Sequence, residues 1–422
     1  MLRWYVYFMI GLLVVLIFSA CQPITPVAKQ ALTGLRPDAP PYAIRGPHAV
    51  GVHDFVIGEG EDQLFISVWY PALNPHGVKE EIDYSVNTDL PAVQEVWYPP
   101  VREKKIKLTV KGHALHDAAP DSENGPYPLV IFAGGWANFR QTYSYLKEHL
   151  ASHGFVIMSW DIRQENYEAF WAGAALRSLD AQRTIDYADQ LTAADGALAG
   201  LIDTERIAIA GHSSGGASAL WGGGAQMSLG WCIANADQIV DFTNCSQFPD
   251  HREEIASLLG LASVPEGLWP ATNDPRVDAI IPMSPDADTW GAGFEGGNAV
   301  KVPTLFMAAS HDTIIKPEGS EKLLYPQIGA AEKSLVVFEN ADHLIFFNDC
   351  RDAPWLHEFM EWICAEPVWE RDRGHDLTNH FVTAFLLAEL KDDTEAAKAL
   401  APENVTFPGI HYETTAYNTT NQ

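Results

Sequence analysis

The strongest chemical signal in the chain is the run Gly211-His212-Ser213-Ser214-Gly215. It follows the apolar residues 207–210 and precedes the small residues 216–219, so it predicts a tight turn from a strand into a helix. A serine on such a turn projects its hydroxyl above the sheet, and the flanking glycines leave room for the backbone. Ser213 has a glycine two positions away on each side, whereas Ser214 does not. We therefore expect Ser213 to act as a nucleophile in acyl transfer.

A serine nucleophile needs a base and an orienting carboxylate, and after this turn both should lie downstream in the order Ser, Asp, His. Asp312 follows the apolar segment 302–307, and His343 follows the predicted strand 334–338. Active-site residues of open α/β sheets lie at the carboxyl ends of such strands. Asp312 and His343 are therefore the predicted partners of Ser213.

Other residues compete for these roles. Asp286 and Asp288 follow the preceding predicted strand, 277–281, and remain an alternative source of the carboxylate. Asp342, beside the predicted base, is expected to lie on the surface. His212 is expected to pack the turn rather than to act as the base.

Acyl transfer also needs donors for the developing oxyanion. The backbone amide of Ser214, the residue after the nucleophile, is the first candidate. The second is the amide of Trp136, because Gly134 and Gly135 after the strand 129–132 allow the chain to turn its amides inward. Four tryptophans near strand ends or the helix after Ser213 either line an acyl pocket or pack the core: Trp136, Trp160, Trp221 and Trp290.

The elements that must position these residues alternate between strand and helix. Short apolar runs typical of buried strands occupy residues 129–132, 155–160, 206–210, 277–281 and 304–307, with helices predicted near 143–152, 174–191 and after 214. This order predicts an α/β fold with a mostly parallel sheet flanked by helices. Alternating residues in 53–70 and 105–110 predict antiparallel strands at one edge of that sheet. Residues 222–275 interrupt the rhythm and are expected to form a lid-like insertion.

Composition excludes some classes of protein. The 422 residues are 47% hydrophobic and 19% charged, which is enough apolar material for a large core and excludes a disordered chain. The formal net charge is −28, from 27 Lys and Arg against 55 Asp and Glu. A field of that sign repels phosphate backbones, so we expect no nucleic-acid partner.

The N-terminus predicts export. Arg3, the apolar residues 4–18 and the run Ser19-Ala20-Cys21 have the order of a secretory signal, and the small residues before the cysteine resemble a bacterial lipobox. This resemblance implies that residues 1–21 are a signal peptide ending at a lipidated Cys21, and that the protein is held by its lipid on the extracytoplasmic side of a bacterial membrane. A plain membrane anchor is the alternative. The proline-rich residues 22–45 predict a flexible tether, and residues 46–422 a single domain.

The remaining cysteines fit an oxidising compartment. Besides Cys21 the chain has Cys232, Cys245, Cys350 and Cys364, and an even number in an exported protein predicts two disulfides. Of the three possible pairings, Cys232 with Cys245 and Cys350 with Cys364 is the simplest. No CxxC pair or His-Glu-x-x-His motif occurs, so no metal is expected.

The chain resembles α/β-hydrolases of the platelet-activating factor acetylhydrolase and dienelactone hydrolase-like branch, to which the polyester hydrolases are related. Five segments carry the resemblance: residues 46–52, 68–71, 128–132, 151–155 and 211–215. The resemblance implies the α/β-hydrolase fold and hydrolysis of carboxylic esters without a cofactor. The chain has Gly134-Gly135 where many relatives have His-Gly, and Ser213 where dienelactone hydrolases have a cysteine.

We therefore expect a serine carboxylic-ester hydrolase that forms an acyl-enzyme with short-chain, phospholipid or aromatic esters. A serine peptidase or amidase of the same fold is the second hypothesis. The third, from another class, is a catalytically decayed lipoprotein that binds ligands.

Overall fold

The computed structural model describes residues 38–88, 108–162, 168–228, 247–286, 293–317, 320–359 and 361–417. One compact unit comprises Ala39–Gln422 and contains every element described below. The predicted signal peptide and Cys21 lie outside the described residues. Within the described ranges, no helix has the length and hydropathy that a membrane span requires.

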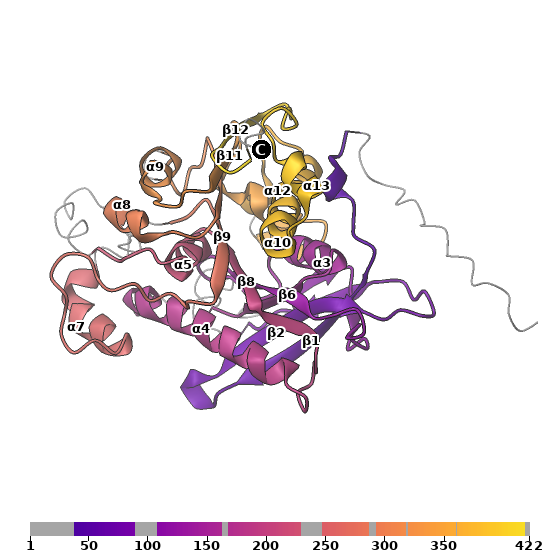
Figure 1. Ribbon diagram of the computed structural model, residues 1–422, viewed down its shortest axis with the longest axis horizontal. Helices are drawn as coiled ribbons and strands as arrows, with labels where there is room; N and C mark the ends of the chain where they lie inside the picture. The colour runs from indigo at the N-terminus through magenta and orange to yellow at the C-terminus, as the bar shows by residue number, and fades with distance from the viewer. Residues whose placement is uncertain are drawn as a thin grey trace, which may run out of the picture. The chain divides into compact units, whose positions relative to one another are not determined.

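A ten-stranded sheet forms the centre of this unit (Figure 1). Its spatial order is β12-β11-β10-β9-β8-β6-β7-β2-β1-β5, and the six strands from β11 to β7 are mutually parallel. The strands of this sheet are β1 Ala49–Ile57, β2 Leu64–Ala72, β5 Leu115–His116, β6 Tyr127–Ala133, β7 Val156–Trp160, β8 Ile202–His212, β9 Val277–Met283, β10 Thr304–Ala309, β11 Lys333–Phe338 and β12 Ile410–Thr414. The predicted α/β fold with a mostly parallel sheet is confirmed.

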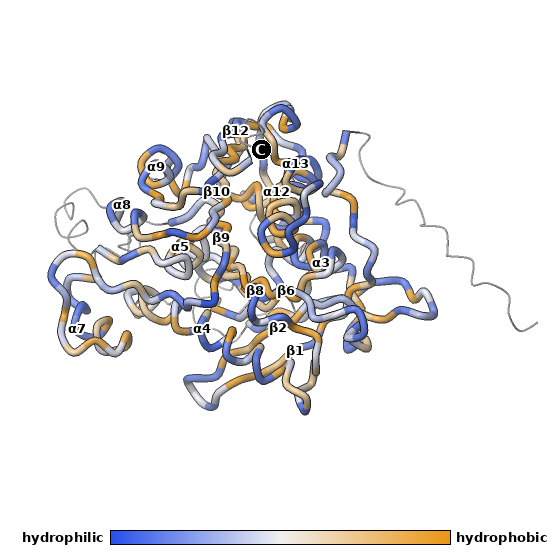
Figure 2. The backbone as a smooth tube through the Cα atoms, viewed as in Figure 1, coloured by the Kyte–Doolittle hydropathy of each residue, from blue (hydrophilic) through white to orange (hydrophobic). Residues whose placement is uncertain are grey.

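Helices cover both faces of the sheet (Figure 1). The principal ones are α3 Ser144–Ser152, α4 Gly173–Thr192, α5 Ser214–Gly222, α7 Phe248–Leu258, α12 Arg371–Lys391 and α13 Thr394–Ala399. Side chains of one strand alternate between the two faces, so Ala208 packs with α3 and α12, whereas Ile209 packs with α4 and α5. The strands are therefore buried on both sides, and Figure 2 shows hydrophobic segments running through them.

The antiparallel edge agrees only in part with the prediction. β1 and β2 pair antiparallel from Ala49 with Ala72 to Ile57 with Leu64, as expected. The strand expected at 105–110 is β4, Thr109–Gly112, which pairs with β3, Ile82–Ser85, in a separate two-stranded sheet. The prediction that it lies in the main sheet was wrong, because alternation indicates a half-buried strand but not its neighbour.

The packed unit begins seven residues before Gly46, the expected start of the domain. Pro41–Ala43 forms a 3₁₀ turn, and Ala43 is buried. The Tyr42 carbonyl lies 2.8 Å from Nε2 of His149 on α3. These contacts place the end of the expected tether in the folded body.

The expected insertion, 222–275, is described in part. Residues 229–246, with Cys232 and Cys245, lie outside the described residues, and so does that disulfide prediction. After them, α7 contacts α4, and Trp269 is buried with its amide donating to the Met227 carbonyl. The described part of the segment thus packs on the α4 side of the body.

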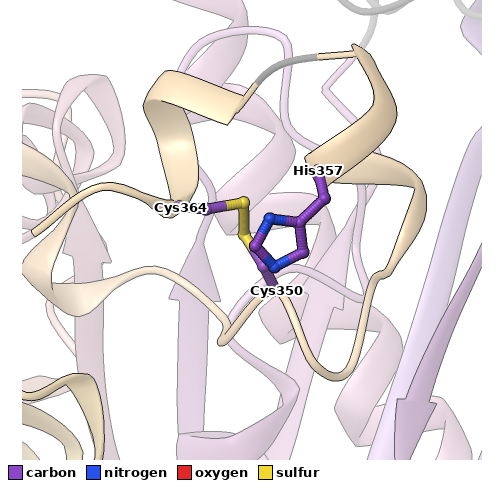
Figure 3. Close-up of side chains that lie close together, drawn as sticks. All are labelled: Cys350, His357 and Cys364. Carbon is purple, nitrogen blue, oxygen red and sulfur yellow. A yellow bond between two sulfur atoms is a disulfide. The ribbon is translucent and has the colours of Figure 1, made fainter.

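The disulfide between Cys350 and Cys364 is formed (Figure 3). One ring nitrogen of His357 and the two sulfur atoms lie within 4.8 Å of one another. Because the sulfurs are bonded to each other, neither is available as a thiolate ligand. The bond instead closes a loop with a sequence separation of 14 residues.

Replacing both Cys350 and Cys364 with serine is expected to lower the free energy of unfolding by about 3 kcal/mol, because the loop would no longer be constrained in the unfolded chain. Urea unfolding of the double variant measures this loss, with the exposed neighbour His357→Gln as the control. An unchanged midpoint and slope in the double variant would contradict the expected constraint.

Helix α12 is buried on nearly every side, and it carries a buried histidine, His380. Neither ring nitrogen of His380 has a hydrogen-bond partner among the described residues. Burial lowers the pKa of His380 to about 4, so the folded state keeps the ring neutral where the unfolded chain protonates it.

Between pH 6.5 and 4, His380 is therefore expected to reduce stability as the pH falls, because the unfolded state binds more protons. His380 contributes about 1.4 kcal/mol per pH unit to the slope of the free energy of unfolding against pH. Urea unfolding at pH 7 and pH 5 should show a shallower pH dependence in His380→Leu than in the wild type. The exposed His76→Gln serves as the control, and parallel profiles for wild type and His380→Leu would refute the prediction.

Candidate active site

Ser213 lies between the end of β8 and the start of α5. Its backbone has φ 60° and ψ −126°, a conformation that non-glycine residues rarely adopt. Its amide donates to the Met283 carbonyl at the end of β9, and its carbonyl accepts from Gly216 and Ala217 in the first turn of α5. The Ser213 residue is half-buried, so this strained turn presents it at the carboxyl edge of the sheet.

The glycines of the turn are required by close backbone contacts. A Cβ atom on Gly211 would lie 2.2 Å from the Gly215 carbonyl oxygen. A Cβ atom on Gly215 would lie 2.1 Å from the Ala133 carbonyl oxygen at the end of β6. Both distances are far below van der Waals contact, so the glycine spacing reflects packing of the turn against β6.

Asp312 and His343 are brought together, although they are far apart in the sequence. Oδ2 of Asp312 lies 2.6 Å from Nδ1 of His343, and both side chains are buried. The other carboxylate oxygen, Oδ1, accepts the backbone amides of Ile314 at 3.0 Å and Ile315 at 2.6 Å. The carboxylate is thus held by its own loop while it orients the imidazole.

Asp342 joins the loop of Asp312 to the loop of His343. The sequence analysis expected Asp342 on the surface and did not predict this role. Its Oδ1 accepts the backbone amides of Thr313 at 2.9 Å and His343 at 2.7 Å. Burial would raise the pKa of Asp342, but the hydrogen bonds from Thr313 and His343 outweigh it and hold the pKa below its usual value. Asp342 is therefore ionised and fixes the main chain of both loops.

Of the alternative carboxylates, Asp286 is described and Asp288 is not. Asp286 is buried after β9, and its amide donates to the Ser213 carbonyl at 3.1 Å. The carboxylate that contacts Nδ1 of His343 is that of Asp312. Asp288 lies outside the described residues.

The loop after β6 lies against Ser213. A Cβ atom on Gly135 would be 3.3 Å from Cβ of Ser213, so the loop passes directly beside the residue. Ser214, the first residue of α5, has its amide at the helix N-terminus, where amides lack partners in the helix. Trp136 is half-buried, and its ring packs edge-on against Phe170 at 5.2 Å between centroids.

Arg177 contacts the loop after β6, and the sequence did not predict this role. It is buried on α4, and its Nη1 donates to the Gly134 carbonyl at 2.7 Å. This bond fixes the carbonyl of Gly134, and with it the path of the loop beside Ser213. A single arginine within a helix gives no such signal in the sequence.

The described candidate tryptophans lie in different parts of the fold. Trp160 and Trp221 are fully buried in the core between the sheet and α4 and α5. Among the described candidates, only Trp136 lies in the loop after β6, which passes beside Ser213. Trp290 lies outside the described residues. For Trp160 and Trp221, core packing was the correct alternative.

The chain is similar in sequence to several known proteins and families. Residues 38–174 match platelet-activating factor acetylhydrolase, isoform II. Cutinase est2 of Thermobifida alba is 26% identical over 222 residues, 52% of this chain and 54% of that protein. Platelet-activating factor acetylhydrolase of Cavia porcellus is 29% identical over 136 residues, 29% of each chain. Cutinase 2 of Thermobifida cellulosilytica is 33% identical over 98 residues, 23% of this chain and 35% of that protein.

The chain thus spans about half the length of cutinase est2, and less of the other two relatives. A longer match comes from the profile of the prolyl oligopeptidase family, which covers residues 140–366. That range contains Ser213, Asp312 and His343 and is more than half of the chain. The chain therefore belongs to the prolyl oligopeptidase family and has the α/β-hydrolase fold.

Proposed function

We propose that the protein is a serine carboxylic-ester hydrolase with Ser213 as nucleophile, His343 as base and Asp312 as orienting carboxylate. The observation that carries the proposal is the buried 2.6 Å contact between Asp312 and His343, whose backbone carbonyl lies 3.0 Å from Nε2 of His212, the residue before Ser213. The similarity to cutinases and to platelet-activating factor acetylhydrolase supports ester substrates.

In the first step, Nε2 of His343 takes the proton of the Ser213 hydroxyl as Oγ attacks the ester carbonyl. Asp312 stabilises the resulting imidazolium, and the amides of Ser214 and Trp136 donate to the oxyanion. The imidazolium then protonates the departing alcohol. In the second step, His343 removes a proton from water, which attacks the acyl carbon. The bond to Oγ of Ser213 then breaks as the imidazolium returns the proton to Oγ, which releases the acid and restores the free enzyme. These steps need no cofactor.

The substrate class is tested with p-nitrophenyl esters of increasing acyl length, an acetylated phospholipid and an aromatic diester, with the Ser213→Ala protein as the blank. Turnover of at least one class above the blank is expected. The acyl-length profile then separates short-chain from phospholipid and aromatic substrates. No turnover of any ester would refute the proposal.

A peptidase or amidase is the second candidate, and the match to the prolyl oligopeptidase family favours it. Both activities use the same three residues, so they differ in the substrate cleft. Cleavage of peptide p-nitroanilides without cleavage of esters would favour this candidate. Binding of esters without turnover of esters or amides would favour the decayed ligand-binding protein.

We further propose that the protein is an exported lipoprotein, held by lipid on Cys21 at the extracytoplasmic side of a bacterial membrane. The order of residues 3–21 supports export, and the disulfide between Cys350 and Cys364 is typical of an oxidising compartment. Metabolic labelling with a radioactive fatty acid tests this proposal. Label that persists in Cys21→Ser would refute it.

A further inference from the structure

His212, the residue before Ser213, contacts two other parts of the site with its two ring nitrogens. Nδ1 lies 2.7 Å from the hydroxyl of Tyr143, and Nε2 lies 3.0 Å from the backbone carbonyl of His343. The rings of His212 and His343 are 4.5 Å apart between centroids. His212 is buried, so water does not compete for either bond.

The partners determine which nitrogen carries the proton. A carbonyl oxygen only accepts, so Nε2 of His212 must be protonated and donate to His343. In a neutral ring Nδ1 is then an acceptor, and the Tyr143 hydroxyl donates to it. Burial and then the nearby His343 lower the pKa of His212 well below its usual value, which keeps the ring neutral.

Tyr143 is itself fixed in place. It precedes α3 with φ 64°, and its amide donates to Oδ1 of Asn348, in the segment after His343. Nδ2 of Asn348 donates to Oγ of Ser144 at 2.9 Å. The ring of Tyr143 packs against Phe132 and Phe347, so its hydroxyl has little freedom to move.

We propose that Tyr143 and His212 are positioning residues, which fix the main chain of His343 so that its imidazole meets Ser213. This inference rests on the proposed function. His343 is then held at three points: Nδ1 by Asp312, the amide by Asp342 and the carbonyl by His212. Without the hydrogen bond from His212, Asp342 and Asp312 still hold the amide and the side chain of His343, but its backbone can rotate away from the turn.

Two substitutions at one position separate the two bonds. In His212→Gln the amide nitrogen takes the place of Nε2 and can still donate to the His343 carbonyl. In His212→Asn the amide oxygen takes the place of Nδ1 and can still accept from Tyr143, but the donor to His343 is lost. We expect His212→Asn to lower kcat at least tenfold, within the roughly hundredfold cost of a 1 Å misplacement, and His212→Gln to recover most of it. KM should change less than twofold in both, because the two ring nitrogens of His212 are buried and bonded to Tyr143 and His343.

His149 is the matched control. It is also buried, and its Nε2 contacts a backbone carbonyl, that of Tyr42, which precedes β1 and is not part of the Ser213 turn. His149→Asn and His149→Gln should lower the melting temperature as the His212 variants do, yet leave kcat within twofold. Equal kcat in His212→Asn and His212→Gln, whether both equal the wild type or both fall together, would overturn the inference.

Tyr143→Phe keeps the inference testable if the His212 variants do not fold, because it keeps the ring and removes only the hydroxyl. A loss of kcat of threefold or more at unchanged KM is expected, and an unchanged kcat would overturn the inference. Failure of the proposed function is distinguishable, since then the wild type itself would hydrolyse no ester.

Discussion

Replacing Ser213 with alanine is expected to lower kcat for ester hydrolysis by about 10⁶, as in other enzymes with a serine triad. In the proposed mechanism the Ser213 hydroxyl forms the covalent bond to the acyl carbon, so its loss removes that step. The positive φ of Ser213 is equally strained in alanine, so the fold and the melting temperature should be retained. Steady-state kinetics with p-nitrophenyl acetate measures the loss.

Ser218→Ala is the control for this prediction. Ser218 lies one turn further along α5, and its hydroxyl donates to the Ser214 carbonyl at 3.2 Å. Its loss should change kcat less than tenfold. A loss below tenfold in Ser213→Ala would remove Ser213 from the mechanism.

Asp312→Asn is expected to lower kcat by about 10⁴. The amide group can donate to Nδ1 of His343, and the ring then carries its proton on Nε2, where it cannot accept one from Ser213. The geometry of the loop should survive, because the side-chain oxygen can still accept the amides of Ile314 and Ile315. Kinetics near pH 7.5, with a check of the melting temperature, measures the effect.

Asp286→Asn gives the comparison, because Asp286 is the rival carboxylate. It should lower kcat less than tenfold, since the contact to Nδ1 of His343 comes from Asp312. The reverse ranking of the two variants would assign the orienting role to Asp286.

The elements that carry local signals could be predicted from the sequence. The turn at Ser213 is set by glycines whose neighbours are close in the chain or in the adjacent strand, so its motif is readable. Asp312 and His343 could be paired because parallel strands end at one edge of the sheet. The strand β12 was missed because it has only five residues and none of them is fully buried, so its apolar signal is small although it alternates.

The contacts that hold the site could not be predicted, because they join residues distant in sequence. Arg177 reaches Gly134 across 43 positions, and Tyr143 reaches His212 across 69. The Asp342 side chain ties Thr313 to His343, and nothing in its local sequence distinguishes it from a surface carboxylate. Such contacts depend on the three-dimensional arrangement of loops rather than on propensity or periodicity.

The role of Ser213 as nucleophile is tested most directly by reaction of the purified protein with a fluorophosphonate, followed by mass spectrometry of the labelled peptide. We expect one adduct, on Ser213, with ester hydrolysis lost in proportion to labelling. We also expect Asp312→Asn and His212→Asn to react more slowly than the wild type. Full loss of activity with the adduct on another residue, or ester turnover that persists after stoichiometric labelling of Ser213, would contradict this role.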